Sequence, residues 1–368
     1  MERASNSLLT KLPHGNPQLA SMVLLTPGPC QTSEAVRQAG ALQETNHRDP
    51  AFIRTLQTIK QQLLQVNPGT ETWNCYLLGA SGTGAVEAML TSTIGDGQTL
   101  VVESGYYSER LSAILEAHRM PFQRARFGWL EPWDLAILEK RIKEGSFEAV
   151  VCTHHETTSG RLNPVSDLGA ICRRYGVHLL VDAMSSFGAD LLHTENVDAL
   201  CSSSNKCLHS VPGVSFVLSK PELVKQIANF PARTFYLDIR RYEGDEPPMT
   251  PPVAAVLSLA KALELYPGVE QRQARYETFT SKIREAVRYH SLQTAVLDSE
   301  ASCTLTCCEL PRDWTSDAWL KVNAERGYML YGCKGELKER YFQVANMGEL
   351  ADADVLGWIA TLNDLLDL

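Results

Sequence analysis

Over its first two-thirds the chain alternates short apolar runs with amphipathic helical patterns. Apolar residues recur at helical spacing from Phe52 to Val66, which predicts a helix that ends before the Asn-Pro-Gly turn at 67–69. Five apolar runs predict strands, at 75–78, 99–103, 149–153, 177–182 and 214–218. Helical patterns lie between them, at 84–93, 109–118, 132–144 and 164–175. Strands that are apolar on both faces and separated by helices predict a mostly parallel sheet covered by helices.

The pattern changes after about residue 220. Residues 229–252 are rich in proline and charge, which predicts an irregular surface segment. Helical patterns follow at 253–266 and 271–289, then strand-like runs at 302–309, 328–331 and 341–345 and a last helix at about 352–366. We therefore expect an α/β protein with an N-terminal arm (1–22), a large domain (23–252) and a smaller C-terminal α+β domain (253–368).

Composition and charge narrow the possible partners. Hydrophobic residues make up 44% and charged residues 21% of the 368 residues, which is typical of a globular protein and excludes a disordered or fibrous chain. The net charge of -9 repels nucleic acid and anionic lipid surfaces, so neither is an expected partner. A local cluster of donors could still bind a small anion.

Location and metal content are expectations from the same sequence. The first fifteen residues lack the apolar core of a secretory signal, and no apolar run approaches the ~20 residues of a membrane helix. We expect a cytoplasmic protein. The ten cysteines form no CxxC pair and have no histidine at zinc-ligand spacing, so we expect reduced, buried thiols and no metal site.

The segment 79–87, GASGTGAVE, follows a predicted strand and opens a predicted helix. Its small residues leave backbone N–H groups and the hydroxyls of Ser81 and Thr83 at a helix N-terminus, which suits a phosphate group. The segment is neither a P-loop nor a dinucleotide fingerprint. A tight turn that binds nothing stays an alternative.

Two charged residues follow buried strands. Asp182 ends the apolar run 177–182, at the sheet edge where α/β proteins bind ligands, although a helix cap is an alternative role. Lys206 lies 24 residues further on, in the otherwise uncharged run SSSNKC, whereas lysines usually occupy solvated surfaces. A phosphate cradle, a carboxylate and an amine on one sheet edge are the groups that pyridoxal phosphate requires.

Five segments carry a resemblance to a known family: 25–29 (LTPGP), 81–83 (SGT), 155–160 (HETTSG), 182–188 (DAMSSFG) and 204–207 (SNKC). In residue type and order they resemble the class V aminotransferases of fold type I, over roughly residues 23–350. The resemblance is strongest to the 2-aminoethylphosphonate–pyruvate transaminases of that family. It implies a large domain that binds pyridoxal phosphate and a homodimer in which each active site borrows residues from the neighbouring subunit.

The resemblance also implies roles for individual residues. Lys206 would hold the cofactor as an imine and then move a proton, and Asp182 would keep the pyridine nitrogen protonated. The other implied cofactor-binding residues are Ser81, Gly82, Thr83, Tyr107, Thr158, Asn205 and, reaching across from the neighbouring subunit, Thr250. Plain core packing is the alternative role for Tyr107. The implied substrate residues are Pro27, Gly28 and Glu156.

The sequence departs from the family at one position. Gln343 stands where the family has the arginine that binds an acidic substrate group, and a neutral amide cannot form the charge-assisted fork of a guanidinium. Arg340 is near, but positions 340 and 343 of a strand point to opposite faces, so it substitutes only if irregular backbone redirects it. Arg48 and Arg233 are further candidates.

Three hypotheses remain at this point. The first is a pyridoxal-phosphate-dependent aminotransferase that moves an amino group to a 2-oxo acid such as pyruvate. The second is a lyase or carbon–carbon bond-forming enzyme with the same cofactor, which the missing arginine favours. The third is an inactive member that serves as a binding subunit, which the presence of Lys206 and Asp182 opposes.

Overall fold

The computed structural model describes residues 22–41 and 44–367, so the N-terminal arm expected over 1–22 lies outside the described residues except for Met22. A seven-stranded sheet has the order β2-β10-β9-β8-β5-β3-β4. Strand β10 runs antiparallel to both neighbours, and the other neighbouring pairs are parallel, which confirms the mostly parallel sheet. The strands are β2 (Asn74–Leu78), β3 (Gln98–Glu103), β4 (Phe122–Arg126), β5 (Phe147–Thr153), β8 (His178–Asp182), β9 (Ala199–Ser203) and β10 (Ser215–Ser219).

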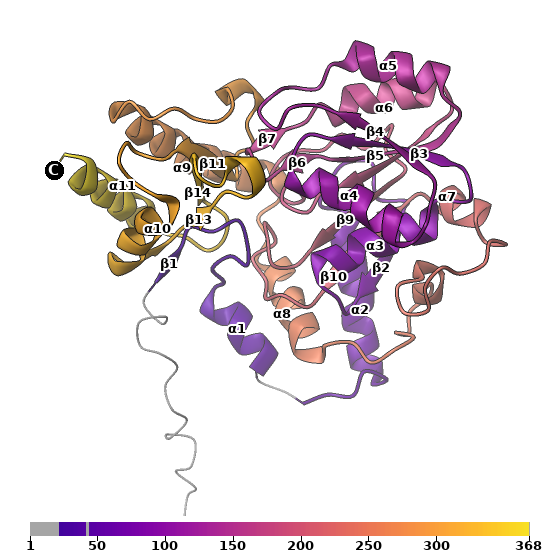
Figure 1. Ribbon diagram of the computed structural model, residues 1–368. Helices are drawn as coiled ribbons and strands as arrows, with labels where there is room; N and C mark the ends of the chain where they lie inside the picture. Colours follow the sequence, from indigo (N-terminus) through magenta and orange to yellow (C-terminus); the bar gives the residue numbers. More distant parts are fainter. Residues whose placement is uncertain (1–21, 42–43, 368) are drawn as a thin grey trace, which may run out of the picture.

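Helices cover both faces of this sheet (Figure 1). One face packs against α2 (Pro50–Leu63), α5 (Leu135–Glu144), α6 (Val165–Arg174) and α8 (Val253–Glu264). The other packs against α3 (Gly82–Thr93), α4 (Tyr106–Ala117) and α7 (Pro221–Gln226). Successive side chains of a strand point to opposite faces, so Leu100 and Val102 enter the first core and Val101 enters the second. Strands β8, β9 and β10, near the middle of the sheet, are almost entirely buried between the two cores.

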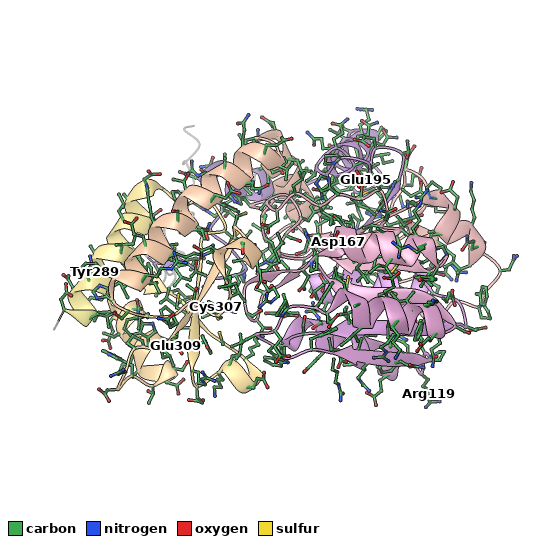
Figure 2. All side chains as sticks on the ribbon, turned by 90° about the horizontal axis from the view of Figure 1, so that it is seen from above. Arg119, Asp167, Glu195, Tyr289, Cys307 and Glu309 are labelled. Carbon is green, nitrogen blue, oxygen red and sulfur yellow. The ribbon has the colours of Figure 1, made fainter. Side chains whose placement is uncertain are left out.

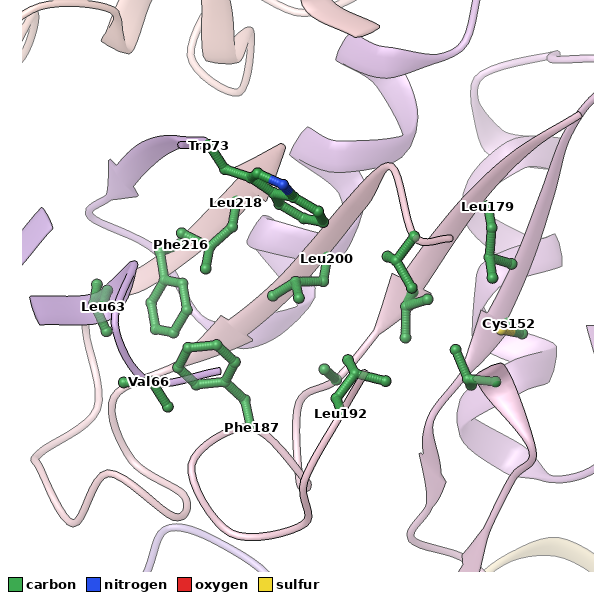
Figure 3. Packing of buried hydrophobic residues seen from close by; sticks show 14 of the residues in the cluster. Leu63, Val66, Trp73, Cys152, Leu179, Phe187, Leu192, Leu200, Phe216 and Leu218 are labelled. Atoms are coloured by element: carbon green, nitrogen blue, oxygen red, sulfur yellow. The ribbon is translucent and has the colours of Figure 1, made fainter. Parts of the chain in front are cut away.

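Large side chains fill the first core around β9 and β10. The rings of Phe187 and Phe216 lie 5.1 Å apart at 66°, an edge-to-face arrangement that aromatic pairs favour. Figure 3 shows them beside Leu200 and Trp73. Each such fully buried apolar side chain stabilises the fold by about 1.5–3 kcal/mol, so this core fixes the strand ends that carry the site.

A smaller unit follows in the chain and lies beside the sheet (Figures 1 and 2). Seen from above in Figure 2, it carries Tyr289, Cys307 and Glu309, while Arg119, Asp167 and Glu195 mark the larger unit. Its antiparallel sheet has the order β11-β14-β13, and its core centres on Trp319, Phe342 and Trp358. Its elements are α9 (Val269–Tyr289), β11 (Leu305–Glu309), α10 (Ser316–Glu325), β13 (Tyr331–Gly332), β14 (Tyr341–Ala345) and α11 (Asp352–Leu366).

Two segments cross the expected domain borders. Strand β1 (Val23–Leu24) pairs with β12 (Tyr328–Met329) of the smaller unit, and α8 packs in the core of the larger one. The division into domains at residues 22 and 252 stays a prediction, and these contacts favour a second border after α8. Helix α1 (Glu34–Ala41) also contacts α8.

The remaining elements are short. The segment 229–252 is irregular as expected, apart from the 3-10 helix η2 (Ile239–Tyr242), whose Ile239 and Tyr242 are buried. The others are the hairpin β6 (His155–Glu156) and β7 (Arg161–Leu162) and the 3-10 helices η3 (Asp298–Glu300) and η4 (Gly335–Leu337). No helix within residues 22–41 and 44–367 is long and apolar enough to cross a membrane.

Candidate active site

The N-terminus of α3 is suited to bind an anion. Ser81 is its N-cap in extended conformation, and its side chain makes no capping hydrogen bond. The N–H groups of the first turn therefore have no hydrogen bond from a capping side chain. Such free N–H groups favour binding of a negatively charged ligand. A Cβ on Gly82 would collide with the Met184 side chain, so glycine lets the turn pack closely on the loop after β8.

Asp182 lies at the carboxyl end of β8 and is 3% exposed. Its Oδ1 accepts the backbone N–H of Met184 at 3.0 Å, and its Oδ2 accepts Arg110 Nη2 at 3.1 Å. The carboxylate caps no helix but faces a cavity. A buried carboxylate with these two donors is suited to hold a positive charge in the cavity.

Lys206 lies in the loop after β9, with its side chain directed toward the segment 27–28. Its Nζ donates a hydrogen bond to the backbone carbonyl of Pro27, and burial lowers the pKa of its ammonium. Gly28 has a φ of +121°, and a Cβ there would lie 2.5 Å from Lys206 Nζ. Only glycine lets this loop pack on the lysine.

A cavity of about 210 Å³ gathers most of the expected residues. The expected residues that line it are Ser81, Gly82, Thr83, Tyr107, Asp182, Asn205 and Lys206. It is also lined by residues that the sequence did not single out: Arg110, Thr153, His155, Thr157, Met184, Ser185, Ser203 and Pro212. One sheet edge thus brings together a helix N-terminus, a carboxylate and an amine.

Glu156 and Thr158, expected near the cofactor and substrate, do not line this cavity. The Glu156 carboxylate accepts the backbone N–H of Ser108 at 3.0 Å and the Thr158 hydroxyl at 2.6 Å. Thr158 Oγ1 in turn accepts the N–H of Tyr106 at 3.1 Å. Both side chains therefore hold the start of α4, and burial raises the pKa of Glu156. Alternation along the backbone directs their neighbours His155 and Thr157 into the cavity instead.

Gln343 and Arg340 are also placed differently from the expectation. Gln343 lies on the central strand of the small sheet, and its Nε2 donates to the carbonyls of Thr157 at 2.5 Å and Thr158 at 3.1 Å. Both amide hydrogens are thus used within the protein. Arg340 is exposed, and its guanidinium packs 5.4 Å from the ring centroid of Tyr341. It lies in the turn before β14 and does not line the cavity.

The other expected residues lie outside the cavity wall. Pro27 and Gly28 contact Lys206 from the neighbouring loop. Thr250 is exposed on the irregular segment. Arg233 donates to the carbonyls of Ile94 and Gly95 and so ends α3, and the exposed Arg48 lies 3.8 Å from Glu246. Neither arginine faces the cavity.

His155 is a cavity residue that the sequence reasoning missed. Its Nδ1 lies 3.3 Å from the Ser185 carbonyl and 3.3 Å from Thr304 Oγ1, and its Nε2 is buried with no hydrogen-bond partner among the described residues. Burial lowers the pKa of His155 to about 4. With Nδ1 protonated to donate to Ser185, the imidazole is a neutral acceptor at Nε2. Thr153, His155 and Thr157 alternate along the chain and all face the cavity, and this alternation is the sequence signal that could have identified His155.

This donor set fits pyridoxal phosphate. The α3 N-terminus suits its phosphate, Asp182 its pyridine nitrogen and the Lys206 amine its aldehyde carbon, while the buried Nε2 of His155 leaves one polar position to be satisfied. The fold and the site together define a pyridoxal-phosphate-dependent enzyme of the aminotransferase type.

Comparisons with known proteins give the family. A sequence model described as "Aminotransferase class-V" matches residues 81–312, and the chain belongs to that family. A 2-aminoethylphosphonate–pyruvate transaminase of Klebsiella pneumoniae is 30% identical, covering 94% of this chain and 97% of that protein. A second, of Paraburkholderia xenovorans, is 32% identical, covering 94% and 96%. An alanine–glyoxylate aminotransferase structure from Nostoc superposes with a TM-score of 0.89 at 25% identity, over all of both chains.

These findings decide among the three hypotheses. The chain is a pyridoxal-phosphate-dependent transferase of the class V aminotransferases, which confirms the expected family, fold and cofactor. They do not favour the lyase or carbon–carbon bond-forming alternative, since the named relatives are transaminases. An inactive binding subunit is likewise not supported.

Proposed function

We propose that this enzyme takes the amino group from an amine of the 2-aminoethylphosphonate type and gives it to a 2-oxo acid such as pyruvate. The observation that carries the proposal is the meeting of Lys206, Asp182 and the N-terminus of α3 around one cavity. Two relatives that cover 94% of the chain are named as 2-aminoethylphosphonate–pyruvate transaminases, which supports the substrate pair.

When bound, pyridoxal phosphate supplies an electron sink that acidifies the C–H bond next to the substrate nitrogen. Lys206 is the residue that would hold it, through Nζ. When it is free, Nζ would take the proton from that carbon as a general base and release it again as a general acid. Burial lowers the pKa of Lys206, so the freed amine is more readily the neutral base that this step needs.

The neighbouring residues bind and orient. Asp182 would keep a proton on the pyridine nitrogen, and Tyr107 would pack against the ring. The N–H groups of α3, with Ser81, Gly82, Thr83 and Asn205, would bind the phosphate. We assign the remaining polar contacts to His155 and Thr157, which face the cavity, in place of Glu156 and Thr158.

We also propose a cytoplasmic homodimer with shared active sites. Thr250 lies exposed on a proline-rich segment, where a neighbouring subunit can cover it, and the family resemblance gives this threonine a role in the partner's site. All ten cysteines are free thiols, as is usual for proteins of reducing compartments.

The test uses purified enzyme loaded with cofactor and incubated with a panel of amines without acceptor. A transaminase converts its cofactor stoichiometrically to the pyridoxamine form, which the visible spectrum and mass spectrometry detect. Addition of pyruvate should regenerate the original form and yield alanine. The Lys206→Ala variant is the inactive control. Substrate consumption without pyridoxamine formation would contradict the proposal.

A further inference from the structure

The proposed substrate carries an acidic group, and the cavity offers it no free cation. This inference rests on the proposed function and concerns the same site. Arg110 bridges Asp182 and Thr83, two residues assigned to the cofactor, and Lys206 would hold the cofactor itself. Gln343 is neutral, and its amide hydrogens are bound to the carbonyls of Thr157 and Thr158. Within one subunit, a cation can therefore reach the acidic group only from the rim of the cavity.

Lys334 is placed to do so. It follows β13, whose Tyr331 pairs directly with Gln343 on β14. Its Nζ lies 4.7 Å from the ring centroid of Tyr106 and 5.5 Å from that of Tyr107, which lines the cavity. Among the described residues no carboxylate oxygen lies within 4.0 Å of this ammonium, although carboxylates pair with Lys321 and Lys338 nearby. Lys334 is thus a cation held on aromatic faces without an anion.

The loop that carries Lys334 is anchored on both sides. Cys333 donates its backbone N–H to the carbonyl of Tyr341 at 3.3 Å, and its Sγ lies 3.7 Å from the carbonyl of Thr158. Gly335 packs so closely on Trp129 that a Cβ would collide with the indole. The Trp129 Nε1 donates to Glu109 of α4 at 3.1 Å. These contacts fix the base of the lysine between the segment 157–158 and α4, on the side of Gln343.

We propose that Lys334 binds the acidic group of the substrate and supplies the positive charge that the neutral Gln343 lacks. A lysine ammonium is a compact point charge without the planar fork that matches a carboxylate. It therefore suits a tetrahedral, doubly charged group that can be approached from several directions. The substrate class that this arrangement fits is a short primary amine ending in a phosphonate, in preference to an α-amino carboxylate.

The experiment compares Lys334→Met and Lys334→Arg with the matched control Lys338→Met, which removes an exposed lysine paired with Glu339 at 3.7 Å in the same loop. Kinetics use 2-aminoethylphosphonate and propylamine, an amine without an acidic group. Calorimetry on the holoenzyme measures binding of ethylphosphonate, which lacks an amine and cannot react. Lys334→Met should raise KM for 2-aminoethylphosphonate and weaken ethylphosphonate binding, each by about 10- to 100-fold, with kcat within about threefold. Lys334→Arg, which keeps the positive charge, should stay close to the wild type in KM for 2-aminoethylphosphonate and in ethylphosphonate binding.

Other outcomes separate the two levels of the argument. Unchanged ethylphosphonate binding in Lys334→Met, or an equal loss in Lys338→Met or with propylamine, would overturn the role of Lys334. A wild type that binds ethylphosphonate through Lys334 but aminates no acceptor would leave this role intact and refute the proposed transamination. If the wild type transaminates 2-aminoethylphosphonate and the Lys334 variants do so equally well, the proposed function stands and the role of Lys334 is refuted.

Discussion

Arg110 Nη2 lies 3.1 Å from Asp182 Oδ2, and the same guanidinium donates through Nη1 to Thr83 Oγ1 at 3.1 Å. Its carbon also lies 5.1 Å from the ring centroid of Tyr107. One cation therefore spans the position proposed for the pyridine nitrogen and the end of α3 proposed for the phosphate. In the protein without cofactor, this arginine is the charged partner of a buried carboxylate.

Arg110→Gln should destabilise the cofactor-free protein more than the holoenzyme. Without Arg110 the Asp182 carboxylate keeps only the N–H of Met184, and loss of a hydrogen bond to a charged group costs about 2 kcal/mol. A protonated pyridine nitrogen would restore a partner. Urea unfolding of both forms measures the difference.

The matched control for this comparison is Arg124→Gln. Arg124 lies 3.0 Å from the buried Glu103, a similar ion pair outside the cavity. Its loss should affect both forms of the protein equally. An equal loss in both forms for Arg110→Gln as well would show that Arg110 acts only as a structural residue.

His155→Gln should reduce the sensitivity of the fold to acid. The pKa of His155 is lowered to about 4 by burial, against 6.5 in an unfolded chain. Between those values the unfolded state binds more protons, so this histidine contributes full stability above about pH 6.5 and loses it as the pH falls to about 4. The difference amounts to roughly 3 kcal/mol.

Denaturant unfolding at pH 7, 5.5 and 4.5 tests this contribution. The decline in unfolding free energy should be smaller in His155→Gln than in the wild type, while His193→Gln, which changes an exposed histidine, should follow the wild type. If the unfolding free energy declined equally with falling pH in all three proteins, His155 would be charged in the folded state or accessible to water.

Gln343→Arg should raise activity toward alanine. A guanidinium at this position supplies the bidentate contact that a carboxylate prefers, and a charge-assisted hydrogen bond contributes about 1.5–3 kcal/mol, or roughly 10- to 150-fold in kcat/KM. Steady-state kinetics with alanine and 2-aminoethylphosphonate measure the change. Gln343→Leu is the control, because it removes the bonds to the carbonyls of Thr157 and Thr158 without adding charge. No gain with arginine would show that position 343 does not select the substrate.

Thr250→Ala should weaken cofactor retention without changing the fold of one subunit. Thr250 is exposed in the single chain, so a loss of cofactor affinity requires that it contacts a neighbouring subunit. Equilibrium dialysis of the cofactor and light scattering measure the effect, with Thr278→Ala on the exposed face of α9 as the control. A monomeric wild type that retains its cofactor fully would refute the shared site.

The residues predicted from the sequence are those whose chemistry conflicts with their surroundings. Asp182 and Lys206 are single charges beside strands that are otherwise apolar, and such charges are rarely tolerated there without a function. The helix α11 and strand β14 were predicted with the bounds that the structure shows, because their apolar periodicity is uninterrupted. Strand β4 was missed because only Ala125 of its five residues is buried.

The expected and the observed cavity linings differ because of side-chain alternation along the backbone and because of one helix boundary. The sequence alone does not say which of two adjacent threonines faces inward, so Thr158 was chosen where Thr157 lines the cavity. Helix α4 was predicted to begin at 109 but begins at Tyr106. With the true start, Tyr107 and Arg110 lie three residues apart on one helix face, and Arg110 becomes a candidate. Tertiary contacts with Glu156 set that start, and they are absent from local sequence.

The segment 25–30 joins the small sheet to Lys206. Leu25 donates its backbone N–H to the carbonyl of Met329 and accepts the N–H of Ala345, each at 3.0 Å. Five residues later, Cys30 donates its N–H to the carbonyl of Asn205 at 3.3 Å, and the Pro27 carbonyl between them accepts Lys206 Nζ. A rotation of the smaller unit away from the sheet would therefore move the Pro27 carbonyl that accepts the hydrogen bond from Lys206 Nζ. Six residues of backbone thus connect the position of the smaller unit directly to the contact that holds the lysine amine.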